Sequence, residues 1–97
     1  VQIDHIVALS YAWRHGASAW TDEQRVAYAN DPLNLIAVDG PTNMGKSDDG
    51  PSDWLPENTA YLCTYLGRFV EVLAVNGLTV EPADYAVLDA LSPECAA

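Results

Sequence analysis

The sequence predicts an α+β fold in a single domain over residues 1–97. Apolar runs over residues 1–10 and 33–38 have the composition and length of short strands. Helix caps and apolar spacing predict helices in much of the remaining chain. Hydrophobic residues make up 49% of the sequence, which excludes a disordered tail. A core this small is only marginally stable by itself, so we expect a further stabilising feature.

Two helices are expected after the first strand. Ser10 is placed to cap a short helix over residues 11–14, which a following glycine would end. Thr21 and Gln24 have the spacing of a capping box, which predicts a helix over residues 22–30. The apolar residues of this second helix are contiguous rather than periodic, so the prediction depends on its cap.

A second strand and a short helix are expected in the middle of the chain. The Asp31-Pro32 pair ends the preceding helix, because the residue before proline avoids the α region. A strand is then predicted over residues 33–38, a turn over 39–41 and a helix over 42–47. The acidic segment 47–53 lacks the glycine placement of an EF-hand, so it is predicted to be a solvated loop.

The longest predicted helix lies in the C-terminal half. Asn58 is placed to cap a helix over residues 59–76, which Gly77 would end. Four apolar residues at helical spacing indicate that one face is buried: Leu62, Leu66, Phe69 and Leu73. Pro82 at a first helical position predicts a last helix that ends near Leu91.

The two cysteines, Cys63 and Cys95, predict a disulfide. Their spacing is not that of a zinc knuckle. A bond between them would close a loop of about 30 residues and stabilise the fold by roughly 3 to 4 kcal/mol in the chain-entropy model. Two buried free thiols are the alternative.

Two features indicate the compartment. Disulfides persist in oxidising environments, so the disulfide hypothesis favours a secreted or extracytoplasmic protein. The sequence also opens inside a predicted strand, with no initiator methionine and no signal peptide, so we expect that an upstream segment was removed. No apolar run approaches the roughly 20 residues of a membrane span, so no membrane partner is expected.

The chain is strongly acidic. It has 14 Asp and Glu against four Lys and Arg, for a formal net charge of −10. Nonspecific affinity for nucleic acid comes from neutralising phosphates, so this charge excludes a protein that coats nucleic acid. Any phosphate chemistry must therefore depend on a few local charges and a metal.

Polar residues in and near the two predicted strands are the best candidates for a chemical site. Asp4 and His5 interrupt an apolar run, where a purely structural strand has little reason to place them. Asn34 lies in the second predicted strand, and Asn43 and Lys46 lie in the short helix. Phosphodiester hydrolysis needs a base that activates water and a cation that stabilises charge on the phosphate. These residues, with a bound metal, would supply both.

Three segments resemble the HNH endonucleases: Asp4-His5-Ile6-Val7, Asn34-Leu35 and Asn43-Met44-Gly45-Lys46-Ser47-Asp48. The chain is most similar to secreted bacterial HNH proteins related to the GmrSD restriction endonuclease. Those proteins also have counterparts of Ala12-Trp13-Arg14, Asn30-Asp31-Pro32, Trp54-Leu55-Pro56 and Gly77-Leu78-Thr79-Val80. The HNH domain of RNA-guided CRISPR nucleases has a similar Asn-x-Gly-Lys-Ser-Asp ending. The resemblance implies a ββα-metal HNH core, a short antiparallel hairpin plus a helix, with additional flanking helices.

The resemblance also implies a metal-dependent endonuclease that hydrolyses DNA, with a role for each residue. His5 would be the general base, Asn34 would orient it and Lys46 would contact phosphate. Asp4 and Asn43 would be the metal ligands. Asn43 stands where many HNH proteins have a second metal-binding histidine, and a carboxylate with an amide oxygen favours Mg²⁺ or Mn²⁺ over Zn²⁺. Taken alone, Asn34 would be a structural residue at a strand edge and Lys46 a solvated cation.

Two positions depart from the close relatives in this family. Ala8 stands where proline is frequent, and Asp49 stands where a basic residue is frequent. The second departure predicts weak substrate affinity. It keeps a competing function open, in which the chain is a catalytically weak HNH-fold module that binds nucleic acid or protein.

Four further residues have no predicted role in chemistry. His15 is expected to be a surface histidine near a helix C-terminus, because no ligand-like residue is close to it in sequence. Core packing is favoured over base stacking for all three tryptophans, because they accompany helical apolar positions and loop closures rather than a basic groove: Trp13, Trp20 and Trp54.

Overall fold

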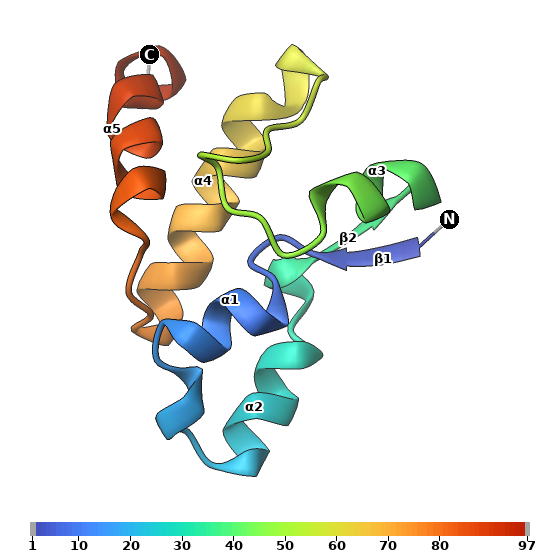
Figure 1. Cartoon of the computed structure of the whole chain (residues 1–97), viewed down its shortest axis with the longest axis vertical. Coiled ribbons are helices and arrows are strands. Elements are labelled where there is room, and N and C mark those ends of the chain that lie inside the picture. Colours follow the sequence, from blue (N-terminus) through green and yellow to red (C-terminus); the bar gives the residue numbers. More distant parts are fainter. Residues whose placement is uncertain (1, 97) are drawn as a thin grey trace.

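A two-stranded antiparallel sheet joins the start of the chain to its middle. The computed structural model describes residues 2–96, in which β1 (Gln2–His5) pairs with β2 (Leu35–Val38). The register runs from Gln2 opposite Val38 to His5 opposite Leu35. With the helices around it (Figure 1), this sheet confirms the α+β class and the antiparallel strand pair.

Both strands are shorter than predicted. The chain leaves β1 after His5, because Ile6 and Val7 both turn into the core and are fully buried. Before β2, Pro32 opens a 3₁₀ turn, and the Asp31 side chain caps this turn by accepting from the Leu33 amide at 3.0 Å. A strand cannot begin until this turn ends.

Four helical segments separate the strands: α1 (Leu9–Arg14), the 3₁₀ turn η1 (Ala17–Ala19), α2 (Asp22–Ala29) and the 3₁₀ turn η2 (Pro32–Asn34). The capping box of Thr21 and Gln24 is confirmed at the start of α2. The predicted cap of α1 is wrong, because α1 begins at Leu9 without a side-chain cap and the Ser10 hydroxyl donates to Asp48 at 3.1 Å.

α3 (Gly40–Lys46) follows β2 and starts earlier than predicted. The Asp39 carboxylate accepts from the Thr42 amide at 3.1 Å, so the segment predicted as a turn is the capped first turn of this helix. Hydrogen bonds from the Thr42 hydroxyl and the Thr42 amide lower the pKa of Asp39. α3 ends where Ser47 takes a positive φ of 50° and the Asp49 amide donates to the Lys46 carbonyl at 3.0 Å.

α4 (Thr59–Asn76) and α5 (Pro82–Ala96) lie side by side along one flank of the molecule (Figure 1). The Asn58 cap and the left-handed Gly77 at the end of α4 are confirmed. α5 continues through Pro93 and includes Cys95, whereas the prediction ended it near Leu91. No helix in residues 2–96 is long and apolar enough to cross a membrane.

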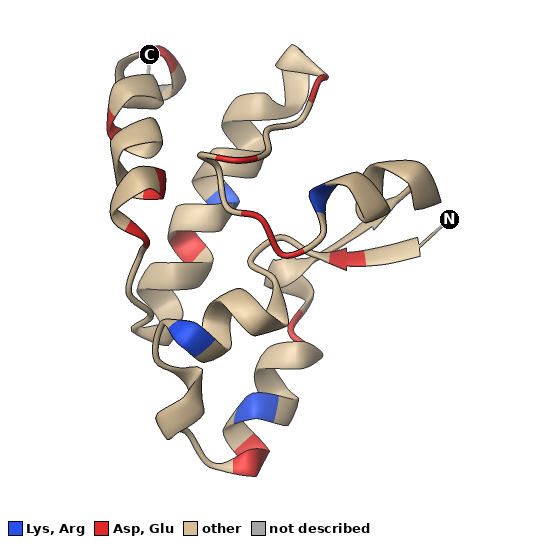
Figure 2. Cartoon of the chain, viewed as in Figure 1, with Lys and Arg blue, Asp and Glu red and all other residues tan. Residues whose placement is uncertain are grey.

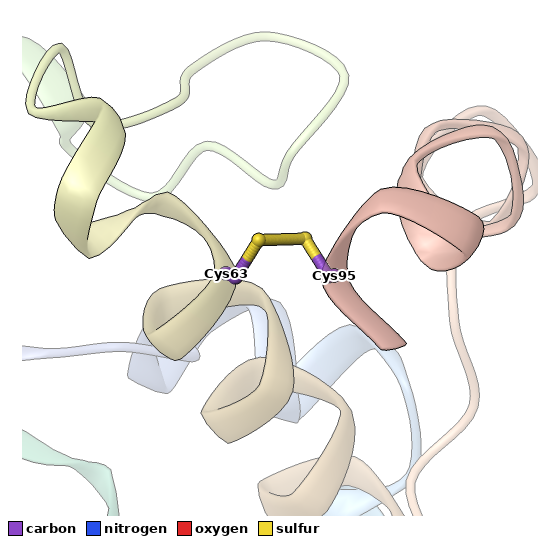
Figure 3. The surroundings of a disulfide bond; sticks show 2 residues. All are labelled: Cys63 and Cys95. Atoms are coloured by element: carbon purple, nitrogen blue, oxygen red, sulfur yellow. A yellow bond between two sulfur atoms is a disulfide. The ribbon is translucent and has the colours of Figure 1, made fainter. Parts of the chain in front are cut away.

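The predicted disulfide is confirmed between Cys63 of α4 and Cys95 of α5 (Figure 3). Their Cα atoms are 5.1 Å apart and the two residues are separated by 32 positions in sequence. The bond ties the C-terminal helix to the longest helix of a small domain.

The hydrophobic core lies between α4 and the turn that follows β1. Tyr65, Phe69 and Val72 of α4 meet Ile6 and Val7 there, and each of these five residues is at most 2% exposed. The remaining buried apolar residues are Tyr11, Ala12, Ala17, Tyr28, Leu66 and Leu73. The predicted apolar stripe of α4 therefore faces this core.

The acidic segment 47–53 is anchored and not simply solvated, which corrects the prediction. Gly50 and Pro51 are buried, and the Ser52 amide donates to Asp84 of α5 at 2.8 Å. A Cβ atom at Gly50 would lie 2.1 Å from the Asp84 carboxylate, so only glycine fits this close approach. The Tyr11 hydroxyl also donates to Asp84, at 2.7 Å, so this one carboxylate joins α1, the acidic segment and α5.

Candidate functional site

Asp4 and Lys46 form a buried ion pair between β1 and α3. The Lys46 Nζ atom lies 3.2 Å from Oδ2 and 3.4 Å from Oδ1 of Asp4, and it donates to the His5 carbonyl at 2.8 Å. Lys46 is 1% exposed and Asp4 is 8% exposed. In Figure 2 the red part of β1 and the blue end of α3 mark the positions of this pair. The interpretation of Lys46 as a solvated cation is therefore wrong.

Asn43 lies on the same side of β1 as this ion pair. The side chains of Gln2 and Asp4 lie on one face of β1, because every second strand residue shares a face. Asn43 and Lys46 are one helical turn apart on α3. Each of these helix residues contacts one of the strand residues: the Asn43 Nδ2 atom donates to Gln2 Oε1 at 2.8 Å, and Lys46 pairs with Asp4. The two predicted metal ligands thus share the interface between β1 and α3.

The donor chemistry of Asp4 and Asn43 fits a divalent cation of the magnesium type. Within residues 2–96, no three His, Cys, Asp or Glu side chains gather as a metal site. Mg²⁺ nevertheless keeps several waters and is bound by one or two carboxylates together with substrate phosphates. The Asp4 carboxylate and the Asn43 amide oxygen, which is the atom not used in the bond to Gln2, are oxygen donors of the type that such a cation takes.

His5 points to the opposite face of β1, because neighbouring strand residues alternate. Its Nε2 atom lies 2.8 Å from the carbonyl oxygen of Ala29, the last residue of α2. A carbonyl can only accept, so Nε2 must carry the proton of the neutral ring. Nδ1 then keeps its lone pair, which is the state that a general base needs. The structure therefore does not bring the His5 and Asp4 side chains together on one face.

Asn34 holds the backbone immediately after His5. Its side chain is 1% exposed, and it both accepts from the Val7 amide at 2.8 Å and donates to the Val7 carbonyl at 2.9 Å. Its own carbonyl accepts from the Ile6 amide at 2.9 Å. The hydrogen bonds of the Asn34 side chain go to Val7 and not to the imidazole, so any orienting effect on His5 through them acts on the main chain.

Tyr28 is a second support of this turn, and no sequence signal identified it. Its hydroxyl donates to the Val7 carbonyl at 3.0 Å, beside the bond from Asn34. Burial raises the pKa of the Tyr28 phenol above its ordinary value. Tyr28 lies one residue before Ala29, so the same turn of α2 supports the backbone after His5 and the ring of His5 itself.

Two residues without a predicted chemical role differ from expectation. The His15 side chain is 11% exposed, its ring stacks on Tyr11 at 4.4 Å and its Nε2 atom lies 3.1 Å from the Glu81 carboxylate, so it is not a surface histidine. Trp13 is 52% exposed, with the Arg25 guanidinium 5.3 Å from its ring centre. Core packing is correct for the other two tryptophans, Trp20 and Trp54.

Every lysine and arginine of the chain is engaged within the fold, and Figure 2 shows them dispersed over four helices. Arg14 pairs with Asp48 at 3.3 Å, and hydrogen bonds from Ser10 and Arg14 lower the pKa of Asp48. Arg25 donates to the Trp20 carbonyl at 2.7 Å, and Arg68 to the Leu33 carbonyl at 2.6 Å. With Lys46 buried against Asp4, the described residues present no cluster of free basic side chains.

Comparison with known proteins gives one curated relative and one family. An uncharacterized secreted protein of Arthroderma benhamiae is 42% identical over 97 residues, which are 98% of this chain and 48% of that protein. The chain thus spans about half the length of this relative. No solved structure matches. Residues 1–83 match the C-terminal domain of GmrSD restriction endonucleases, a span that includes β1, β2 and α3. The chain therefore belongs to the family of GmrSD restriction endonuclease C-terminal domains.

Proposed function

We propose that this domain is a metal-dependent HNH endonuclease that hydrolyses DNA phosphodiester bonds, with His5 as the general base. The observation that carries the proposal is the contact of His5 Nε2 with the Ala29 carbonyl, because it leaves Nδ1 free to take a proton from water. Membership of the GmrSD C-terminal family supports a nuclease-related role.

The other residues position this base and the substrate. Asn34 fixes the chain that leaves His5, and Lys46 fixes the His5 carbonyl from the α3 side. Asp4 and Asn43 would hold Mg²⁺ or Mn²⁺. When bound, such an ion would stabilise charge on the phosphate and on the leaving oxygen. Lys46 is the proposed phosphate contact.

We also propose that the protein acts outside the cytoplasm. The disulfide between Cys63 and Cys95 supports this proposal, since such bonds persist in oxidising compartments. The name of the relative from Arthroderma benhamiae describes that protein as secreted, which agrees with the same compartment.

Plasmid cleavage with Mg²⁺ or Mn²⁺, and with EDTA as the metal-free control, tests the function. We expect His5→Ala to lower the cleavage rate by about 10² to 10⁴, the usual contribution of a positioned general base. The melting temperature should change little, because His5 is partly exposed and makes one side-chain hydrogen bond.

The second histidine of the chain supplies a matched control. His15 lies in contact with Tyr11 and Glu81 and takes no part in the proposed chemistry, so His15→Ala should keep the wild-type cleavage rate below its melting temperature. Wild-type cleavage by His5→Ala would refute the assignment of the base. A wild-type protein that never cleaves with metal would favour the alternative, a binding module, which the dispersed and engaged cations make reasonable.

A further inference from the structure

We propose that Lys46 and a divalent cation compete for Asp4, so that metal binding releases the Lys46 ammonium to contact a substrate phosphate. This inference rests on the proposed function, because it assumes that Asp4 is a metal ligand. It assigns Lys46 two successive partners, first the carboxylate of Asp4 and then the substrate.

The first reason is the geometry of the carboxylate. Both Asp4 oxygens face the Lys46 ammonium, at 3.2 and 3.4 Å, and Asp4 is nearly buried. A divalent cation that binds either oxygen directly would lie close to the ammonium in a poorly screened interior, where like charges repel strongly. The two cations therefore cannot share Asp4 in the arrangement that the structure shows.

The second reason is the burial of Lys46. A residue that is 1% exposed cannot reach the phosphate of a DNA strand. The family resemblance implies that Lys46 contacts phosphate. A buried Lys46 can do so only if its ammonium leaves Asp4. A lysine suits such a change, because its flexible four-carbon stem carries a compact charge that can move to a new partner.

The third reason is the loss of stability that would follow if the Asp4 carboxylate had no counter-ion. A buried carboxylate that loses its counter-ion is strongly destabilising, so the site needs a cation at Asp4 before the metal arrives. Lys46 supplies that cation and also donates to the His5 carbonyl at 2.8 Å. The domain can therefore fold without metal. In that state Lys46 pairs with Asp4 and does not contact phosphate.

Lys46 is the only lysine of the chain, so amine labelling reports on it directly. Wild-type protein is treated with an acylating reagent in EDTA and in Mn²⁺, and peptide mass spectrometry gives the labelling rate of Lys46. An unstructured lysine peptide in the same tube corrects for reagent strength. At Mn²⁺ of about ten times its measured Kd, about nine-tenths of the protein holds metal, so labelling of Lys46 should rise from its protected rate in EDTA to about 0.9 of the rate at saturating Mn²⁺.

Two variants, Asp4→Asn and Lys46→Met, each remove one partner of the ion pair, and Asp48→Asn is their control. In Asp4→Asn, Lys46 should label faster than wild type already in EDTA, and Mn²⁺ should change nothing. Asp48→Asn removes an exposed carboxylate two residues beyond Lys46 and should respond to Mn²⁺ as wild type does. Lys46→Met should bind Mn²⁺ more tightly by calorimetry, and if this variant does not fold, wild-type labelling still decides the question.

The outcomes separate this inference from the proposed function. Mn²⁺ binding by calorimetry with Lys46 still protected would overturn the exchange, even if the protein cleaves DNA. Equal Mn²⁺ affinity in Lys46→Met and wild type would overturn it as well. Metal-induced labelling of Lys46 without any DNA cleavage would support the exchange and count against the endonuclease proposal.

Discussion

Asn34 is the single residue on which the backbone after His5 most depends. Its side chain makes two hydrogen bonds to Val7 and is 1% exposed. Asn34→Ala would leave the Val7 amide unpaired inside the core, while the Val7 carbonyl keeps its bond from Tyr28, and we expect it to lower the free energy of unfolding by about 1 to 3 kcal/mol. Urea unfolding measures this loss.

Asn34→Asp separates the structural effect from the catalytic one. A carboxylate can accept from the Val7 amide and cannot donate to the Val7 carbonyl, so this variant keeps one of the two bonds. If Asn34 positions His5 through the main chain, cleavage should fall in kcat and little in KM. A stable Asn34→Asp protein with unchanged kcat would show that Asn34 is structural only.

The buried tyrosines predict a loss of stability in alkali. Burial raises the pKa of Tyr11, Tyr28 and Tyr65 in the folded protein. A group with a raised folded pKa contributes its full stability below the unfolded value of about 10 and loses it as the pH rises above that value. Urea midpoints measured from about pH 8 to 11 should fall above about pH 10, with tyrosinate absorbance appearing on unfolding. Tyr28→Phe should reduce this fall, and a flat profile would contradict the account.

At the scale of elements, the bounds of a helix with a capping residue and a terminating glycine are predictable from the sequence. The bounds of the strands are less predictable. The bounds of α4 followed from Asn58 and Gly77, because a cap and a left-handed glycine act within a few residues. β2 was predicted to begin earlier because Leu33 resembles a strand residue, yet the proline turn before it competes locally. The Asp39 cap of α3 was available in the sequence, as aspartate followed by an early proline.

The disulfide is the element contact with the clearest thermodynamic consequence. Reduction should lower the free energy of unfolding by roughly 3 to 4 kcal/mol, the chain-entropy value for a loop of about this length. The bond joins α4 to α5 and includes no residue of β1 or α3. Cleavage at low temperature should therefore survive reduction. A Cys63→Ser/Cys95→Ser protein is the control, because reductant should not change its urea midpoint.

At the scale of the whole molecule, charge would limit the affinity of the proposed binding to DNA. The net charge is −10, and the few cations are engaged in the fold. A protein with about 6 to 10 phosphate contacts loses roughly 10³ to 10⁵ in affinity between about 50 and 200 mM salt. This domain should bind weakly and lose affinity only shallowly.

Asp49→Lys tests the same account by replacing an acidic residue after α3 with a cation. Asp49 follows α3 and donates its amide to the Lys46 carbonyl, so the substitution adds a charge three residues beyond Lys46. We expect tighter DNA binding, a salt slope steeper by about one contact, and faster cleavage at limiting substrate. Titrations at several salt concentrations measure both proteins. A steep wild-type slope, or no gain from Asp49→Lys, would contradict the expectation.

The structure brings some of the candidate residues into contact and keeps others apart. Asp4 and Lys46, which are 42 positions apart, are in contact, and Asn34 supports the chain after His5. Burial of Lys46 could not be predicted, because it depends on how α3 packs on β1 and not on any local pattern. The contact from Ala29 to His5 has no sequence signal either, since a backbone carbonyl carries no side-chain identity.

Asp84 lies just beyond the part of the chain that matches the family, although the relative from Arthroderma benhamiae matches over 98% of the chain. The family similarity ends at residue 83, immediately before the buried carboxylate that accepts from Tyr11 and Ser52. Cys95, the partner of Cys63, lies further along the same helix. A protein engineer who cut or transplanted the domain at residue 83 would remove an internal hydrogen-bond acceptor and half of a covalent link. The smallest transferable unit therefore includes α5.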